Sequence, residues 1–218
     1  RTPDTSRFGM MAAPNLMTRG NQPVPSMKNA FNTLMTPRIA CALLLAASCV
    51  APAHAQESAV APLLRHLADR LVTADQVALS KWDSGQPVYD PAREAKVIAN
   101  ASSQATAYGL AAADVSDVFT DQIEANKEVQ YALLNDWRRT GAAPTAQRQS
   151  LPEVIRPKLD ELQKSILQAL REAATARGQA DCPVQVANET GRVAQEKSLD
   201  SLHRIALDHA TARLCSTR

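Results

Sequence analysis

Apolar residues recur at intervals of three and four positions along the C-terminal three quarters of the chain, which is the spacing of amphipathic helices. The first stripe predicts a helix over residues 58–82, which ends in the Gly- and Pro-containing turn at 83–87. Asp90 and Pro91 then supply an N-cap and a first helical residue, so we expect a second helix over residues 91–108.

Further helices are expected beyond this pair. Stripes predict a third helix over residues 114–137 and a fourth over 155–177, with a surface loop of small polar residues at 140–152 between them. After a break at 178–183, a last helical region carries Val193, Leu199, Leu202, Ile205, Ala206 and Leu214. Because the sequence offers no convincing strand-like alternation, we expect an all-α fold, a helical bundle.

Composition supports this fold class. The chain has 218 residues, of which 45% are hydrophobic, and its seven glycines and few aromatic residues favour helix over sheet. That length suits one domain with a core of its own. The formal charge of +2 gives no basic footprint for nucleic acid, so we expect no nucleic-acid partner.

The N-terminal region has the pattern of a signal peptide. Residues 27–28 and Arg38 form a basic segment, and an apolar run follows at 39–50. Ala-His-Ala at 53–55 is the small-x-small pattern that signal peptidase recognises, which predicts cleavage before Gln56. The apolar run is shorter than the ~20 residues of a membrane-spanning helix.

We therefore expect an upstream extension at residues 1–26, a signal peptide at 27–55 and a helical domain at 56–218. This protein would reside in the periplasm or outside the cell, unattached to a membrane after cleavage. In a rival interpretation Cys49 is a lipoprotein cysteine, although Ala46 is a poor residue for the first lipobox position.

Export also changes the interpretation of the cysteines. Cleavage would leave Cys182 and Cys215 as the only pair, and in an oxidising compartment two remaining cysteines most simply form a disulfide. A metal site is the alternative, but no Cys or His lies at ligand spacing beside either of them. We therefore expect a structural disulfide and no metal.

Polar residues interrupt the apolar faces of two predicted helices. Arg70 and Lys81 project from the core side of the first, three turns or about 16 Å apart, and Asn126 and Gln130 interrupt the stripe of the third. Each has a plain structural explanation: long cations lie along apolar edges, and buried amides form networks between helices. Together they predict a site that binds a small dianion without a nucleophile.

Short motifs in this order resemble the all-helical chorismate mutases. They are Asp69–Leu71, Lys81–Trp82, the segment Val88–Glu94 and the region Asp121–Gln130, with eleven positions from Arg70 to Lys81 and nine more to Asp90. The segments Ile155–Asp160 and Leu199–Cys215 are similar to the secreted subclass, which has a signal peptide and a C-terminal disulfide. The resemblance covers Ala61 to Cys215.

The resemblance implies that the chain rearranges chorismate to prephenate without a cofactor, on the phenylalanine and tyrosine branch of aromatic amino acid biosynthesis. Arg70 and Arg156 match the residues that bind the two substrate carboxylates. Lys81 and Gln130 match the pair that hydrogen-bonds the ether oxygen whose bond breaks. Members of the subclass are often homodimers.

The remaining matched positions surround the substrate hydroxyl and one carboxylate. Asp90 and Glu94 match acidic residues near the hydroxyl, and Arg93 matches an arginine that supports them. Asn126 occupies a position where the family more often has Ser or Thr. The alternative to an enzyme is a non-catalytic exported helical protein that binds small anions and descends from a mutase.

Overall fold

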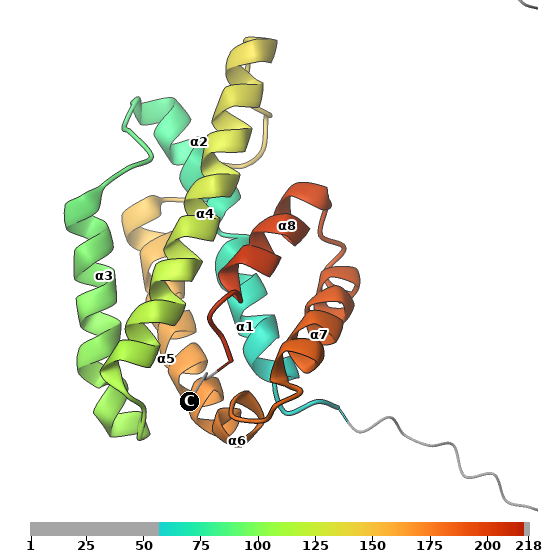
Figure 1. Cartoon of the computed structure of the whole chain (residues 1–218). Coiled ribbons are helices and arrows are strands. Elements are labelled where there is room, and N and C mark those ends of the chain that lie inside the picture. The colour runs from blue at the N-terminus through green and yellow to red at the C-terminus, as the bar shows by residue number, and fades with distance from the viewer. Residues whose placement is uncertain (1–56, 216–218) are drawn as a thin grey trace, which may run out of the picture. The chain divides into compact units, whose positions relative to one another are not determined.

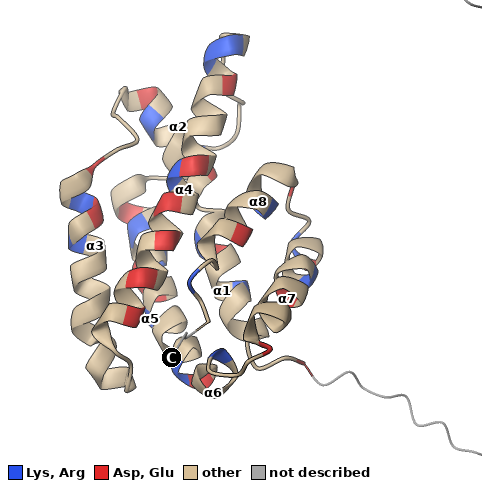
Figure 2. Cartoon of the chain, viewed as in Figure 1, with Lys and Arg blue, Asp and Glu red and all other residues tan. Residues whose placement is uncertain are grey.

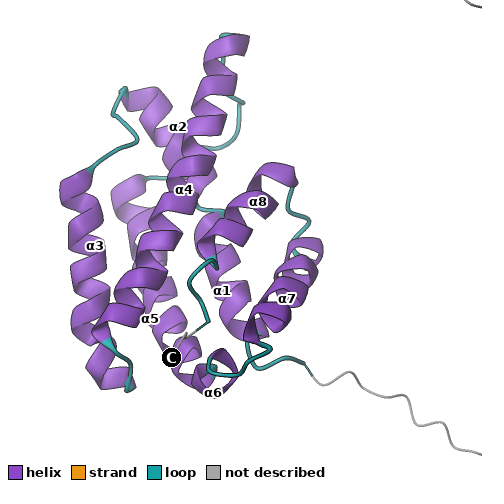
Figure 3. Ribbon diagram, in the orientation of Figure 1, coloured by secondary structure: helices purple, strands orange, loops and turns teal. Residues whose placement is uncertain are grey.

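Residues 57–215 are described by a computed structural model, and within this range the chain forms helices and loops without a strand (Figure 3). The predicted signal peptide, its upstream extension and Cys49 lie outside the described residues. The elements are α1 Ala61–Leu71, α2 Ala74–Ser84, α3 Pro91–Gln104, η1 Ala105–Tyr108, α4 Ala112–Thr140, η2 Leu151–Ile155, α5 Arg156–Glu172, α6 Ala174–Arg177, α7 Cys182–Glu196 and α8 Ser201–Ala210.

The long helix α4 is the organising element of the bundle. It packs against α2, α3 and α8, while α1 packs against α5, α7 and α8 (Figure 1). The core between them is formed by fully buried apolar side chains, among them Leu63, Leu64, Leu67, Leu71, Phe119, Ile166, Leu167 and Leu207. Most of these residues belong to the predicted stripes, although Leu167 and Leu207 do not, and the all-helical prediction is confirmed.

The helix predicted over residues 58–82 is two helices, α1 and α2, separated at Val72 and Thr73. The hydroxyl of the buried Thr73 donates a hydrogen bond to the carbonyl oxygen of Arg70 at 2.7 Å. The backbone N–H of Thr73 also bonds to that oxygen, at 3.3 Å, so the chain tightens locally by one residue. A threonine that bonds back to the preceding turn bends or ends a helix.

The C-terminal half also contains more breaks than predicted. The helix expected over 155–177 begins with the π-helical turn η2 and is interrupted at Ala173, and the last helical region is divided into α7 and α8. Ser198, at φ 51°, turns the chain between α7 and α8. Ile205, predicted to be in the core, is 57% exposed because Ala206 and Leu207 occupy the buried face of α8.

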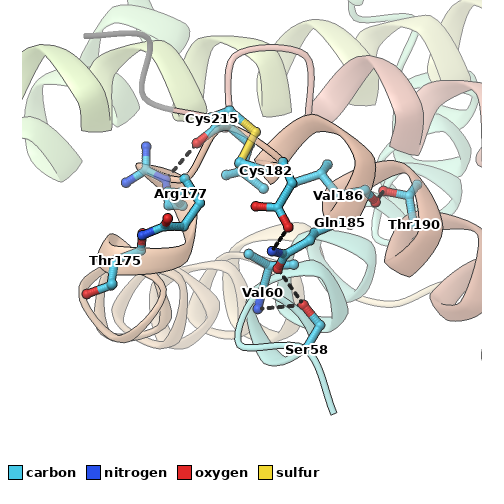
Figure 4. Close-up of a disulfide and its surroundings, with 12 residues drawn as sticks. Ser58, Val60, Thr175, Arg177, Cys182, Gln185, Val186, Thr190 and Cys215 are labelled. Atoms are coloured by element: carbon cyan, nitrogen blue, oxygen red, sulfur yellow. Dashed lines mark hydrogen bonds between the residues drawn. A yellow bond between two sulfur atoms is a disulfide. The ribbon is translucent and has the colours of Figure 1, made fainter. Parts of the chain in front are cut away.

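The disulfide between Cys182 and Cys215 is present, as predicted, and joins the start of α7 to the segment after α8 (Figure 4). It closes a loop of 33 positions, which stabilises the fold by roughly 3–4 kcal/mol in the chain-entropy model. Beside it, Nε of the buried Arg177 donates to the carbonyl oxygen of Leu214 at 2.7 Å. Among the described helices, none is both long and apolar enough to cross a membrane.

His203 on α8 joins that helix to α2 through two carboxylates. Its Nε2 lies 2.9 Å from Asp75 and its Nδ1 lies 2.8 Å from Asp200, the N-cap of α8. These hydrogen bonds, that to Asp75 most of all, outweigh burial and raise the pKa of His203 to about 9. Both ring nitrogens therefore carry protons at neutral pH, and the imidazolium is a charged clasp between the two helices.

This clasp predicts a pH-dependent stability. Because the folded pKa is about 9 against an ordinary value of 6.5, its contribution is fully present below pH 6.5 and is lost as pH rises through 9. The side chains of Asp75 and Asp200 are 49% and 66% exposed, so we expect His203→Gln to cost only about 1–2 kcal/mol at pH 6 and almost nothing at pH 10. Urea unfolding of both proteins at each pH measures this. An equal loss at both pH values would contradict it.

Candidate active site

A cavity of about 170 Å³ opens between α1, α2, α3, α4 and α5. The cavity is lined by all eight residues that the sequence singled out for binding or catalysis, namely Arg70, Lys81, Asp90, Arg93, Glu94, Asn126, Gln130 and Arg156. Helices α7 and α8 do not line it. Both pack on α1, and α8 also packs on α4. Within the described residues, no group of three His, Cys, Asp or Glu side chains could hold a metal ion.

Arg70, near the end of α1, is a buried cation at the wall of the cavity. It is 6% exposed, and its guanidinium lies 5.7 Å from the centre of the Phe119 ring. Burial lowers its pKa to about 10, so the side chain is charged at neutral pH. No carboxylate of the described residues forms an ion pair with it. A buried charge without a partner is costly, and an anion in the cavity would supply that partner.

Lys81 projects into the same cavity from α2. Its ammonium donates a hydrogen bond to the carbonyl oxygen of Val88 at 2.7 Å, which ties the segment after α2 to the helix. Burial lowers the pKa of Lys81, and the nearby carboxylates of Asp90 and Glu94 oppose that effect. Two protons of the ammonium remain available to a bound molecule.

The start of α3 brings two carboxylates to the cavity and caps the helix with both. Oδ1 of Asp90 accepts from the backbone N–H of Arg93 at 3.1 Å, and Oε1 of Glu94 accepts from the backbone N–H of Asp90 at 3.2 Å. This reciprocal pattern resembles a capping box, except that the returning carboxylate, Glu94, lies one position later than in the standard motif. Asp90 and Glu94 therefore cap α3, and both also line the cavity.

Lys127 also lines the cavity, although nothing in the sequence pattern singled it out. Its ammonium lies 2.9 Å from Glu94 and 2.8 Å from Glu124, and 5.3 Å from the centre of the Tyr89 ring. It therefore cross-links α4 to the start of α3. In the sequence, Lys127 lies beside the apolar stripe, where a solvated lysine is expected. Its spacing of three from Glu124 is compatible with an ion pair within α4 but does not indicate the contact with Glu94.

Two amides face the cavity from α4. Nε2 of Gln130 donates to Oδ1 of Asn126 at 2.7 Å, and Nδ2 of Asn126 donates to the carbonyl oxygen of Leu71 at 3.4 Å. Oε1 of Gln130 is buried and has no hydrogen-bond partner among the described residues. The amides thus form the network between helices that burial requires, and they remain positioned to contact a ligand.

Arg156, at the start of α5, closes the rim and is exposed. Its position depends on the loop before it, which is attached to α2. Gln76 donates to the carbonyl oxygen of Gln147 at 3.2 Å and accepts from the backbone N–H of Gln149 at 3.1 Å. Buried Ile155 then anchors the turn that precedes Arg156.

Gln163, which the sequence pattern also did not single out, lines the cavity about two turns further along α5. Its Nε2 donates to Oδ1 of Asn100 at 2.7 Å, which links α5 to α3. The charged residues of α3 lie at its end nearest α2, and the rest of that helix carries none (Figure 2). Cations and amide donors surrounding a small cavity can bind two anionic groups and stabilise charge that develops on an oxygen between them.

Comparison with known proteins agrees with this site. Residues 61–131 match the family model described as chorismate mutase type II. The chain is 32% identical over 158 residues to the secreted chorismate mutase of Mycolicibacterium smegmatis, which is 72% of this chain and 87% of that protein.

Solved structures agree as well. The crystal structure of the chorismate mutase from Burkholderia phymatum is 62% identical, with a TM-score of 0.72, and the match covers 73% of this chain and 97% of that one. The chorismate mutase from Burkholderia thailandensis is 34% identical, with a TM-score of 0.70, over 73% of this chain and 100% of that one.

Proposed function

Because the chain belongs to the family of secreted, all-helical chorismate mutases, we propose that its cavity rearranges chorismate to prephenate by electrostatic and conformational catalysis. The observation that carries this mechanism is the buried guanidinium of Arg70, which has no ion-pair partner within residues 57–215 and faces the same cavity as the ammonium of Lys81. Such a cavity is complementary to a small dianion.

Binding selects the reactive shape of the substrate. Arg70 at the wall and Arg156 at the rim each hold one carboxylate, which favours the compact diaxial conformer in which the two reacting carbons lie close together. Asp90 and Glu94 contact the substrate hydroxyl. The Lys127 ammonium holds Glu94 in place, and the backbone N–H of Arg93 holds Asp90. The reaction is pericyclic, so it needs no general base, nucleophile or cofactor.

Catalysis follows from where charge develops. In the transition state the ether C–O bond lengthens ahead of C–C bond formation, so negative charge accumulates on the ether oxygen. The Lys81 ammonium and the Gln130 amide donate hydrogen bonds to that oxygen and strengthen as its charge grows. They therefore stabilise the transition state more than the bound substrate.

We also propose that the enzyme acts outside the cytoplasm. The predicted signal peptide, cleavage before Gln56 and the Cys182–Cys215 disulfide support export, and the relative from Mycolicibacterium smegmatis is described as secreted. The prephenate it forms is the precursor of phenylalanine and tyrosine. A homodimer, and a mature domain over 56–218, stay predictions.

Two measurements on the oxidised protein test this function. Chorismate absorbance should fall with time as prephenate appears, and a bicyclic dicarboxylate that mimics the transition state should raise the melting temperature. At 100 times its dissociation constant, a ligand adds about 2.7 kcal/mol to stability. Stabilisation by the mimic without loss of chorismate would instead support the non-catalytic anion-binding protein.

A further inference from the structure

A relay of hydrogen bonds runs from the end of α1 to the cavity through two amides of α4. Leu71 is the last residue of α1, and its carbonyl oxygen accepts from Nδ2 of Asn126 at 3.4 Å. Oδ1 of Asn126 accepts in turn from Nε2 of Gln130 at 2.7 Å. Gln130 is 4% exposed, so its amide has little access to water and depends on protein groups for its hydrogen bonds.

The chemistry of the relay fixes its direction. A carbonyl oxygen can only accept a hydrogen bond, so Asn126 must turn its NH₂ group toward Leu71. Its Oδ1 then faces Gln130, which must donate a hydrogen bond to it from its own NH₂ group. If either amide turned over, two oxygens or two NH₂ groups would face each other within the relay.

One proton of Gln130 is thereby reserved for the cavity. Nε2 carries two protons, and Asn126 takes one of them, which leaves the second for an oxygen of a bound molecule. Oε1 remains buried without a hydrogen-bond partner among the described residues. This unsatisfied acceptor has a free-energy cost, so the orientation is imposed by Asn126 rather than by the surroundings of Oε1.

We propose that Asn126 is a positioning residue, which holds the Gln130 amide as a hydrogen-bond donor toward the ether oxygen instead of binding a substrate carboxylate itself. The inference rests on the proposed function and specifies how one of its groups is oriented. The break between α1 and α2 is part of the same device. Thr73 ends α1 at Leu71, and the last carbonyls of a helix lack regular partners within it.

Replacement of Gln130 by glutamate separates the two roles. In the Gln130→Glu variant a protonated carboxyl has one proton where the amide has two, and Oδ1 of Asn126 competes with the substrate for it. A threonine at position 126 relieves this competition, because its hydroxyl can donate to the introduced carboxyl group as well as accept from it. Asn126→Thr should therefore harm the parent enzyme and help the Gln130→Glu variant.

The experiment measures kcat and KM for the parent, Asn126→Thr, Gln130→Glu and the double variant, from pH 5 to pH 8. At pH 5 we expect Asn126→Thr to lower kcat about tenfold in the parent, with KM changed less than about threefold. We expect it to raise kcat about fivefold in Gln130→Glu. Activity of both variants that carry Gln130→Glu should fall as pH rises, since the ionised carboxylate cannot donate.

Asn135→Thr on the exposed side of α4 is the control and should change neither background. Melting temperatures of all variants identify any loss of fold. If Asn126→Thr lowers kcat by the same factor in both backgrounds, or raises KM more than tenfold with kcat intact, the positioning role is wrong. An inactive parent would instead reject the proposed function itself.

Discussion

Replacing Lys81 with methionine should lower kcat/KM by about a thousandfold, on the order of 4 kcal/mol of transition-state stabilisation. Methionine is also unbranched and is one heavy atom shorter, so it removes the charge and the donors with little other change. Because burial already disfavours the ammonium, we expect the melting temperature to change by no more than a few degrees through the lost bond to Val88. Initial rates of chorismate loss, beside thermal unfolding, measure both effects.

The matched control for Lys81 is Lys164→Met. This lysine lies on α5 with its side chain 59% exposed, and its ion-pair partner is Glu161 on the same helix. Lys164 does not line the cavity, so the activity of the Lys164→Met variant should equal that of the parent. If Lys81→Met kept more than a tenth of the parental kcat/KM, charge stabilisation by Lys81 would be wrong.

The helices were predictable because their apolar stripes are long and regular, whereas the breaks depend on tertiary contacts. The stripe through Leu67, Leu71 and Val77 keeps helical spacing across the Val72–Thr73 break, so periodicity alone describes one helix. A single hydroxyl, that of Thr73, decides otherwise once it is buried. For the same reason, packing of α8 and not its sequence pattern determines that Ile205 is exposed.

The candidate site was predictable where polar residues interrupt an apolar face or form an ordered motif. Arg70, Lys81 and Gln130 interrupt such faces, and all three line the cavity. Lys127 could not be found this way, because it lies beside a stripe and meets Glu94 on another helix. Spacing within one helix carries no information about such pairs. Gln163, in contrast, interrupts a stripe, four positions after Leu159 and three before Ile166, so this signal could have found it.

Replacing Arg70 with methionine should have opposite effects on activity and stability. The variant loses the buried arginine that binds a substrate carboxylate. This should lower kcat/KM by a factor of about a thousand and abolish stabilisation by a transition-state mimic. The free protein, however, should gain about 1–3 kcal/mol, because it no longer buries a charge that has no ion-pair partner in the described part of the chain and whose pKa burial has lowered to about 10. Methionine also packs well against the neighbouring Phe119 ring.

Arg177 supplies the matched comparison, because it is similarly buried but has both a carbonyl and a carboxylate partner. It is 2% exposed, donates to the carbonyl oxygen of Leu214 at 2.7 Å and pairs with Asp114 at 3.2 Å. Arg177→Met leaves those acceptors without their donor, so it should lower stability by about 2–3 kcal/mol and leave kcat/KM of the folded protein unchanged. Two buried arginines should thus respond to one substitution with opposite signs in thermal unfolding. Destabilisation of both would show that Arg70 supports the fold and is not a charge held ready for a dianion.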